Sequence, residues 1–352
     1  MSNNKAARNS NIELLRILAM LMIVALHYLN GSMGGALDPN NIQQGTVNYY
    51  IANLFETICI ISVNIFVLIT GYYSIKVIPD GNYSTGIKKP INLYVIMLFY
   101  GVLFFIIALI IGKQELSYTT VLRTILPFFY GKRWFVETYI ILMLLSPFLN
   151  KLLGSLTKRN YIVLLGIWIS LFSVWPSFFY NPPIKDRGYG IVHFITLYMI
   201  AGFIKLHISL IKKSKYQFFL IIGTAFCMIG TYFLRNWFNG WNYDFIFNIV
   251  SAIFVFVFFS MMKPRHNRFV NRVAGTTFGV FLIHTDISLM HFIYQDILHC
   301  SNYYQSPYFI IHFIVSVLLM FVAGAIIDTM RQLLWKITFD KWFDKIRLVI
   351  KA

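Results

Sequence analysis

Long apolar stretches constrain the fold of this chain more than any other feature of its sequence. A transmembrane helix needs about 20 mostly apolar residues, and ten stretches meet that requirement: about 12–30, 47–71, 91–111, 134–153, 161–180, 190–206, 216–234, 243–262, 274–293 and 307–330. Hydrophobic residues fill 58% of the 352 positions and charged residues only 12%, which leaves too little polar surface to coat a soluble globule. We therefore expect a single all-α domain over residues 1–352, a polytopic membrane protein with about ten transmembrane helices.

The distribution of Lys and Arg predicts how these helices are oriented. If the N-terminus is cytoplasmic, 23 of the 30 basic residues fall in segments that face the cytoplasm. By the positive-inside rule, this pattern predicts that both termini are cytoplasmic. The net charge of +17 then mainly reflects membrane topology, and we expect no nucleic-acid partner.

Two segments outside the apolar stretches are amphipathic. The connection 112–133 carries four basic residues, and we expect it to form a helix or a re-entrant segment at the outer surface. If it crossed the membrane, the orientation of every later helix would reverse. The tail 331–352 alternates aromatic and basic residues, which predicts a cytoplasmic interfacial helix.

The sequence indicates neither a disulfide framework nor a metal site. The chain has three cysteines, and no spacing of its Cys and His residues is typical of zinc or iron–sulfur binding. Cys59 and Cys227 lie in apolar runs, where cysteine behaves as a small hydrophobic residue. We therefore expect a function without a metal ion.

The first apolar stretch contains two ionisable side chains, Arg16 and His27. Such groups inside a span are costly and usually face the bundle interior or a wet cavity. Eleven residues at about 100° each bring both side chains to one helix face, about 16 Å apart along the axis. Arg16 then lies near the inner leaflet and His27 in the outer half, and Ala19 and Ile23 between them would line a slot.

Each member of this pair also has a structural interpretation. Arg16 alone is typical of an inner-leaflet anchor whose charge reaches the headgroups, with Glu13 as its salt-bridge partner. His27 lies near the end of its helix and is compatible with an interfacial histidine. The occurrence of both on one face of a span favours the functional interpretation.

Several motifs together resemble the integral-membrane acyltransferase family 3. The first span of that family carries an acidic residue, Leu, Arg and Ala before a histidine, matched here by Glu13, Leu15, Arg16, Ala19 and His27. Similar elements are found at Phe66–Tyr72, which has one additional residue, at Leu145–Asn150 and at Phe281–His284. The resemblance implies a bacterial cytoplasmic-membrane enzyme that moves an acyl group, most often acetyl, from cytoplasmic acyl-CoA (acetyl-CoA) to hydroxyls of envelope polysaccharides or their lipid-linked precursors.

Within this resemblance, His27 is the expected catalytic residue, either as the base that takes the hydroxyl proton or as the acyl acceptor itself. Glu137 begins the fourth span at about the depth of His27 and would orient His27 or the acceptor. Its alternative role is pairing with Arg133, one helical turn away.

The remaining expected contacts are with the two substrates. Three cations would hold the phosphates of the donor, Arg16, Lys88 and Lys89, although many members of the family carry arginines where Gly86–Pro90 has lysines. On the acceptor side we expect an aromatic ring to stack on the sugar and two polar side chains to line the cavity, namely Trp134, His284 and Asn64. Such residues also occur at membrane interfaces and in helix–helix contacts.

Two other function classes compete with acyl transfer. A transporter or flippase of lipid-linked sugars would show inverted repeats and broken mid-membrane helices, and we find neither at matching positions in the two halves. A glycosyltransferase that uses lipid-linked donors would need paired acids in an outer loop, whereas 31–46 holds only Asp38. The transporter or flippase is therefore the alternative that stays open.

Overall fold

The computed structural model describes residues 8–31, 33–75, 88–130, 133–208, 210 and 214–350. This part of the chain is helical and contains no strand, which confirms the all-α prediction. Its helices are α1 (Ser10–Leu29), α2 (Val47–Cys59), α3 (Ser62–Ser74), α4 (Lys88–Ile110), α5 (Tyr118–Ile125), α6 (Pro127–Tyr130), α7 (Trp134–Ser155), α8 (Lys158–Ile169), α9 (Trp175–Phe178), α10 (Ile191–His207), α11 (Ser214–Leu234), α12 (Ile246–Met261), α13 (Arg268–Ala274), α14 (Thr277–His284) and α15 (Phe309–Ile350).

Seven helical segments in the described residues are long and apolar enough to cross a membrane: Ser10–Leu29, Val47–Ser74, Lys88–Ile110, Trp134–Ser155, Lys158–Phe178, Tyr216–Leu234 and Phe309–Ile337. Ile191–His207 and Ile246–Met261 are apolar but shorter. Nine of the ten predicted stretches therefore correspond to an apolar helical segment. The count of ten spans and the cytoplasmic location of both termini stay predictions.

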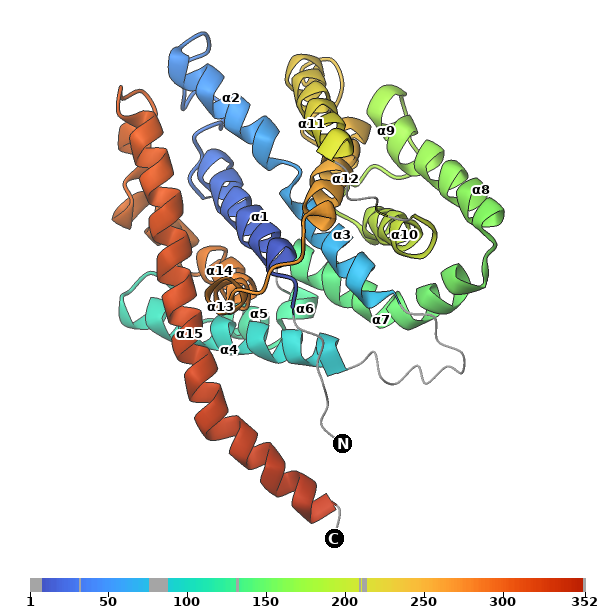
Figure 1. Ribbon diagram of the computed structural model, residues 1–352. Coiled ribbons are helices and arrows are strands. Elements are labelled where there is room, and N and C mark those ends of the chain that lie inside the picture. The colour runs from blue at the N-terminus through green and yellow to red at the C-terminus, as the bar shows by residue number, and fades with distance from the viewer. Residues whose placement is uncertain are drawn as a thin grey trace.

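Helix α1 occupies the centre of the bundle. It contacts α2, α3, α12, α13, α14 and α15, which surround it in Figure 1. Leu15, Ala19, Ile23 and Leu29 are all nearly inaccessible to solvent, whereas Leu14 and Leu18 are 40% and 38% exposed. Most of α1 is therefore packed against neighbouring helices, while one side of its first half stays exposed.

The inner end of α1 is clamped to the connection between α12 and α13. The hydroxyl of Ser10 donates to Asn271 Oδ1 at 2.8 Å and accepts from the backbone N–H of Asn267 at 2.7 Å. The side-chain amide of Asn11 donates to the carbonyl of Lys263 at 2.7 Å. These bonds fix α13, and through it α14, alongside α1.

The ninth predicted stretch, 274–293, is not one continuous helix. The chain turns at Gly275 and Thr276, and α14 ends after eight residues at His284. The side-chain amide of Gln332 on α15 donates to the carbonyl that Gly275 exposes at this turn, at 3.1 Å. A side chain on Gly279 would overlap the buried carboxylate of Asp328 on α15, so glycine lets α14 approach that helix closely. The expectation of an uninterrupted helix over 274–293 was therefore wrong.

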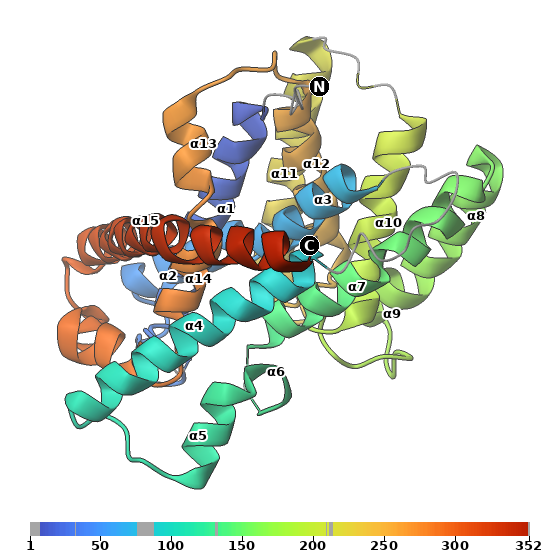
Figure 2. The same ribbon diagram turned by 90° about the horizontal axis from the view of Figure 1, so that it is seen from below.

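The two amphipathic segments also take defined positions. Between α4 and α7, the short helices α5 and α6 lie beside α4 (Figure 2). An eight-residue helix is about 12 Å long, which is too short to cross the hydrocarbon core, and this agrees with the expectation that 112–133 does not span. The tail beyond residue 331 is not a separate element, because α15 continues without a break to Ile350.

Candidate active site

His27 and His284 form a hydrogen-bonded pair at the centre of the structure. Nδ1 of His27 lies 2.8 Å from Nε2 of His284, and the two ring centroids are 4.9 Å apart. His27 belongs to the last turns of α1, and His284 is the final residue of α14. His284 is completely buried, whereas His27 keeps part of its surface accessible. The imidazole of His27 is therefore the one that a substrate could reach, and the imidazole of His284 lies behind it.

The surrounding hydrogen bonds determine the tautomer of both rings when they are neutral. Nδ1 of His284 lies 2.6 Å from the carbonyl oxygen of Val280, which can only accept, so this nitrogen carries the proton. Nε2 of His284 is then a lone-pair acceptor, and Nδ1–H of His27 must donate to it. Nε2 of His27 is consequently unprotonated, and no hydrogen bond joins it to another residue in the described part of the chain. A neutral imidazole with this nitrogen free can act as a base or a nucleophile.

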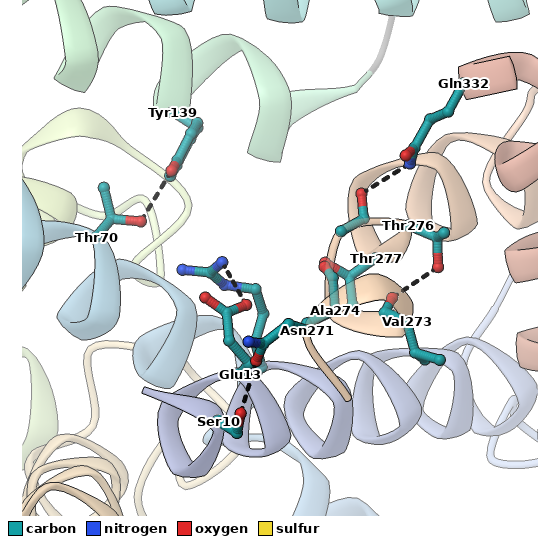
Figure 3. Close-up of polar contacts among 12 residues, drawn as sticks. Ser10, Glu13, Thr70, Tyr139, Asn271, Val273, Ala274, Thr276, Thr277 and Gln332 are labelled. Carbon is teal, nitrogen blue, oxygen red and sulfur yellow. Dashed lines mark hydrogen bonds and ion pairs between the residues drawn. The ribbon is translucent and has the colours of Figure 1, made fainter. Parts of the chain in front are cut away.

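A cavity of about 290 Å³ lies on the Arg16 side of this pair. Arg8 and Arg16 supply its positive charges, and its wall is completed by residues of α3, α4, α7 and the α13–α14 turn. A second cavity of about 210 Å³ shares Arg16, Thr70 and Tyr139 with the first. Figure 3 shows Thr70 and Tyr139, which hydrogen-bond at 2.8 Å, facing Glu13 and Asn271 across this region.

Arg16 lies at the junction of the two cavities. Its guanidinium contacts the Glu13 carboxylate at 3.1 Å and keeps 29% of its side chain exposed. The predicted salt bridge to Glu13 is therefore present, yet it leaves most of the guanidinium donors available to a ligand. Lys89 lines the smaller cavity, while Lys88 is exposed and is not among the residues that line either one. Residues 86 and 87 of the Gly86–Pro90 motif lie outside the described residues.

His27 is not among the residues that line the larger cavity. Phe66, Phe135 and Phe281 line it, and the Phe281 ring centroid is 6.3 Å from that of His27. Neither Ala19 nor Ile23 is among the residues that line these two cavities, whereas Met20, which lies close to the Arg16–His27 face of α1, lines the larger one.

An aromatic cluster and a buried carboxylate lie beyond His27 towards the predicted outer side. The Trp134 ring centroid is 4.4 Å from that of Tyr189 and 5.4 Å from that of Tyr243. Tyr189 is 42% exposed, so the cluster opens to the surface. One turn after His27, the Asn30 amide donates to the carboxylate of Glu56 at 2.9 Å. Glu56 is only 2% exposed, and Tyr189 is the most exposed member of this group.

Glu137 and Asn64 make protein contacts away from the two histidines. Glu137 accepts a hydrogen bond from the backbone N–H of Arg133 at 3.1 Å and so caps the start of α7. The predicted contact between Glu137 and His27 is not present, because His284 occupies Nδ1 of His27. Asn64 bridges the carbonyl of Tyr243 at 2.9 Å and Nε2 of His193 at 2.8 Å. An acceptor-binding role for Glu137 or Asn64 stays a prediction.

Two relationships in this region were not expected from the sequence. His284 was assigned to the acceptor cavity, but it lies behind His27 and positions it. Arg133 was expected to pair with Glu137 through its charge, but its guanidinium forms an ion pair with Asp286. The sequence signal for the His27–His284 pair was the histidine that ends the Phe281–His284 element. Nothing in residue spacing indicated the ion pair between Arg133 and Asp286. Among the described residues, no group of three or more His, Cys, Asp or Glu side chains is arranged to hold a metal ion.

Comparison with known proteins gives one match. A family model described as an acyltransferase domain matches residues 9–329. This range includes both histidines, the aromatic cluster of Trp134, and every residue that lines the two cavities at Arg16 except Arg8. No curated protein and no solved structure matches the chain.

Proposed function

Since the chain belongs to the acyltransferase family whose model spans residues 9–329, we propose that it is a membrane O-acyltransferase. In this proposal it moves an acyl group, acetyl by preference, from cytoplasmic acyl-CoA to a hydroxyl of an envelope polysaccharide or its lipid-linked precursor. The enzyme would work in the bacterial cytoplasmic membrane. The observation that carries the proposal is the hydrogen-bonded pair that leaves Nε2 of His27 unprotonated.

In the direct route, Nε2 of His27 takes the proton of the acceptor hydroxyl as its oxygen attacks the thioester carbonyl. The tetrahedral intermediate then collapses, the C–S bond breaks, and the imidazolium returns the proton to the coenzyme A thiolate. His284 positions the ring throughout and accepts a stronger hydrogen bond when His27 is positively charged. The products are the acylated hydroxyl and free coenzyme A.

In the covalent route, Nε2 of His27 attacks the thioester carbonyl itself and coenzyme A leaves as the thiolate. The acceptor hydroxyl then attacks the acyl-imidazolium, and its proton goes to the coenzyme A thiolate as the neutral imidazole is regenerated. Both routes need the same tautomer of His27, so the pair with His284 is compatible with either.

The two cavities that share Arg16 suit the donor. Coenzyme A is polyanionic, and Arg8, Arg16 and Lys89 place three positive charges around the cavity walls. The acyl end would then point towards Phe281, beyond which His27 lies. His27 itself does not line the cavity, so in this proposal the side chains around Phe281 must shift when the donor binds to let the thioester reach the imidazole. The acceptor would approach from the side of Trp134 and Tyr189, whose rings suit stacking on a sugar.

Comparison of a deletion strain with its parent tests the reaction class. If the proposal is correct, mass spectrometry finds ester groups on an envelope glycan of the parent that are missing from the deletion strain, and the gene restores them. A transporter or flippase would change where lipid-linked sugars accumulate and leave their ester content unchanged. That second result would overturn the proposed function.

A further inference from the structure

A small cavity of about 80 Å³ lies next to the histidine pair but is separate from the inner cavities. It is enclosed by α4, by the α5–α6 segment and by the residues that follow α14. Besides two threonines, its wall contains two kinds of polar side chain. The charged ones are Arg123, Arg133 and Asp286, and the uncharged ones are Gln114 and Ser288. By the predicted topology this cavity faces the outer side. Two of its lining residues are close in sequence to the candidate site, because Asp286 follows His284 by two positions and Arg133 directly precedes Trp134.

The most unusual group in this wall is the guanidinium of Arg133. The residue is only 8% exposed, and one of its amino groups forms an ion pair with the Asp286 carboxylate. The other amino group, Nη1, is fully shielded and has no hydrogen-bond partner in the part of the chain that the structure describes. A buried charged donor without a partner is strongly unfavourable. An acceptor supplied by a ligand would remove this cost.

The charges in the wall determine the sign of that ligand. Asp286 neutralises one guanidinium, and its second carboxylate oxygen accepts the backbone N–H of Ser288 at 3.0 Å. Arg123 is exposed, makes no ion pair within the described residues, and leaves the cavity with a net positive charge. The ligand that fits is therefore an oxyanion.

The number of donors favours a phosphate over a carboxylate. Two guanidinium groups and the Gln114 amide line the cavity, and they supply N–H donors beyond the one that Arg133 gives to Asp286. The Ser288 hydroxyl also lines the cavity but is hydrogen-bonded to the Asp286 carboxylate. A carboxylate offers two oxygens, whereas a phosphate ester offers at least two charged oxygens as well as its ester oxygens and matches the fork of arginine. A volume of about 80 Å³ admits one such group.

We propose that this cavity binds a phosphate ester at the outer side of the membrane, next to the transfer centre. The ester belongs either to the acceptor, as in a sugar linked through phosphate to a lipid or a polymer, or to a phospholipid headgroup. The assignment to the acceptor rests on the proposed function, whereas the binding of phosphate does not.

Direct binding tests the site with the full chain in micelles of a maltoside detergent, which contains no phosphate. Glycerol 3-phosphate is the probe, and calorimetry measures its dissociation constant. We expect saturable binding that Arg123→Gln weakens about tenfold or more, because a charge-assisted hydrogen bond is lost. Lys185→Gln removes an outer-loop cation whose only described contact is Asn181, and it should leave the binding unchanged. Saturable binding that is absent, or equal in the wild type and Arg123→Gln, would overturn the proposal.

A second variant keeps the test independent of folding defects. Replacing Arg133 alone would leave Asp286 buried and unpaired, so Arg133→Gln is combined with Asp286→Asn to remove both charges. We expect this double variant to retain its thermal unfolding midpoint within a few degrees and to lose glycerol 3-phosphate binding. A stable double variant that binds the probe like the wild type would contradict the site.

Lipid composition separates the two sources of the phosphate. If the headgroup is the natural ligand, phosphatidylglycerol added to the micelles displaces glycerol 3-phosphate, and Arg123→Gln abolishes the displacement. If the acceptor is the ligand, phosphatidylglycerol has no effect on the probe. Both outcomes support a phosphate site. Since the assay requires no acyl transfer, its failure and the failure of the proposed function are distinguishable.

Discussion

Nδ1 of His27 on α1 lies 2.8 Å from Nε2 of His284 on α14, although 257 positions separate the two residues in the sequence. The carbonyl of Val280 holds the far side of His284 and so sets the proton positions in both rings. The arrangement serves the purpose that a buried carboxylate serves behind a catalytic histidine, without placing a second charge in the membrane.

Replacement of His284 should therefore lower turnover and leave substrate binding unchanged. Loss of a hydrogen bond to an imidazolium is worth about 1–3 kcal/mol, so His284→Leu should reduce kcat about 10- to 100-fold. His284→Gln offers an amide oxygen to Nδ1–H of His27 and should retain more activity than His284→Leu. The measurement is kcat and both KM values in purified membranes. Equal activity of the two variants, or a change confined to KM, would contradict the positioning role.

Arg16 should affect use of the donor. It lines both inner cavities, and Arg16→Gln should raise KM for acyl-CoA about tenfold or more, because a charged hydrogen bond to phosphate is lost. The KM for the acceptor should not change. Arg159→Gln, in the exposed first turn of α8, is the matched control. An unaltered dependence on acyl-CoA concentration in Arg16→Gln would exclude this role.

Lys88 and Lys89 provide an internal comparison. Both begin α4 and both are exposed, but Lys89 alone lines a cavity. Lys89→Gln should raise KM for acyl-CoA about two- to fivefold, a modest effect because water screens the charge, and the difference from wild type should shrink as salt is added. Lys88→Gln should have a smaller effect. Initial rates over a range of donor concentrations decide this, and equal effects of the two variants would argue against the cavity as the donor site.

Trp134 should contribute to acceptor binding. Its ring packs against Tyr189 at the opening of the aromatic cluster, and Trp134→Leu should raise KM for the acceptor about two- to tenfold through loss of stacking. The KM for acyl-CoA should stay the same. Trp237→Leu replaces a tryptophan that is 79% exposed elsewhere and serves as the control. A raised KM for acyl-CoA together with an unchanged KM for the acceptor would show that Trp134 contributes to donor binding instead.

Sequence patterns were sufficient to predict that the chain is all-helical and to single out the polar residues of the first span. Apolar length predicted the helices, and helical periodicity placed Arg16 and His27 in one membrane segment, because both depend on local structure. Periodicity does not say which helices touch. The contact between α1 and α14 depends on the hydrogen bonds that Ser10 and Asn11 make to residues more than 250 positions away.

The same limit explains the expectations that failed. Glu137 was a reasonable partner for His27 by depth, but it caps its own helix, and the final residue of α14 takes the position instead. The break at Gly275 is supported by Gln332 from α15, which the local sequence of the ninth stretch does not contain. A slot was expected along Ala19 and Ile23, whereas Met20 is the apolar residue of α1 that lines the larger cavity.

The ester content of envelope glycans in a strain whose only copy carries His27→Ala tests the central claim most directly. The account predicts ester levels no higher than those of the deletion strain, with the variant present in the membrane at the wild-type amount. His291→Ala, which changes an exposed histidine after α14, should retain the esters. Wild-type ester levels in the His27→Ala strain would show that Nε2 of His27 neither takes the proton nor carries the acyl group.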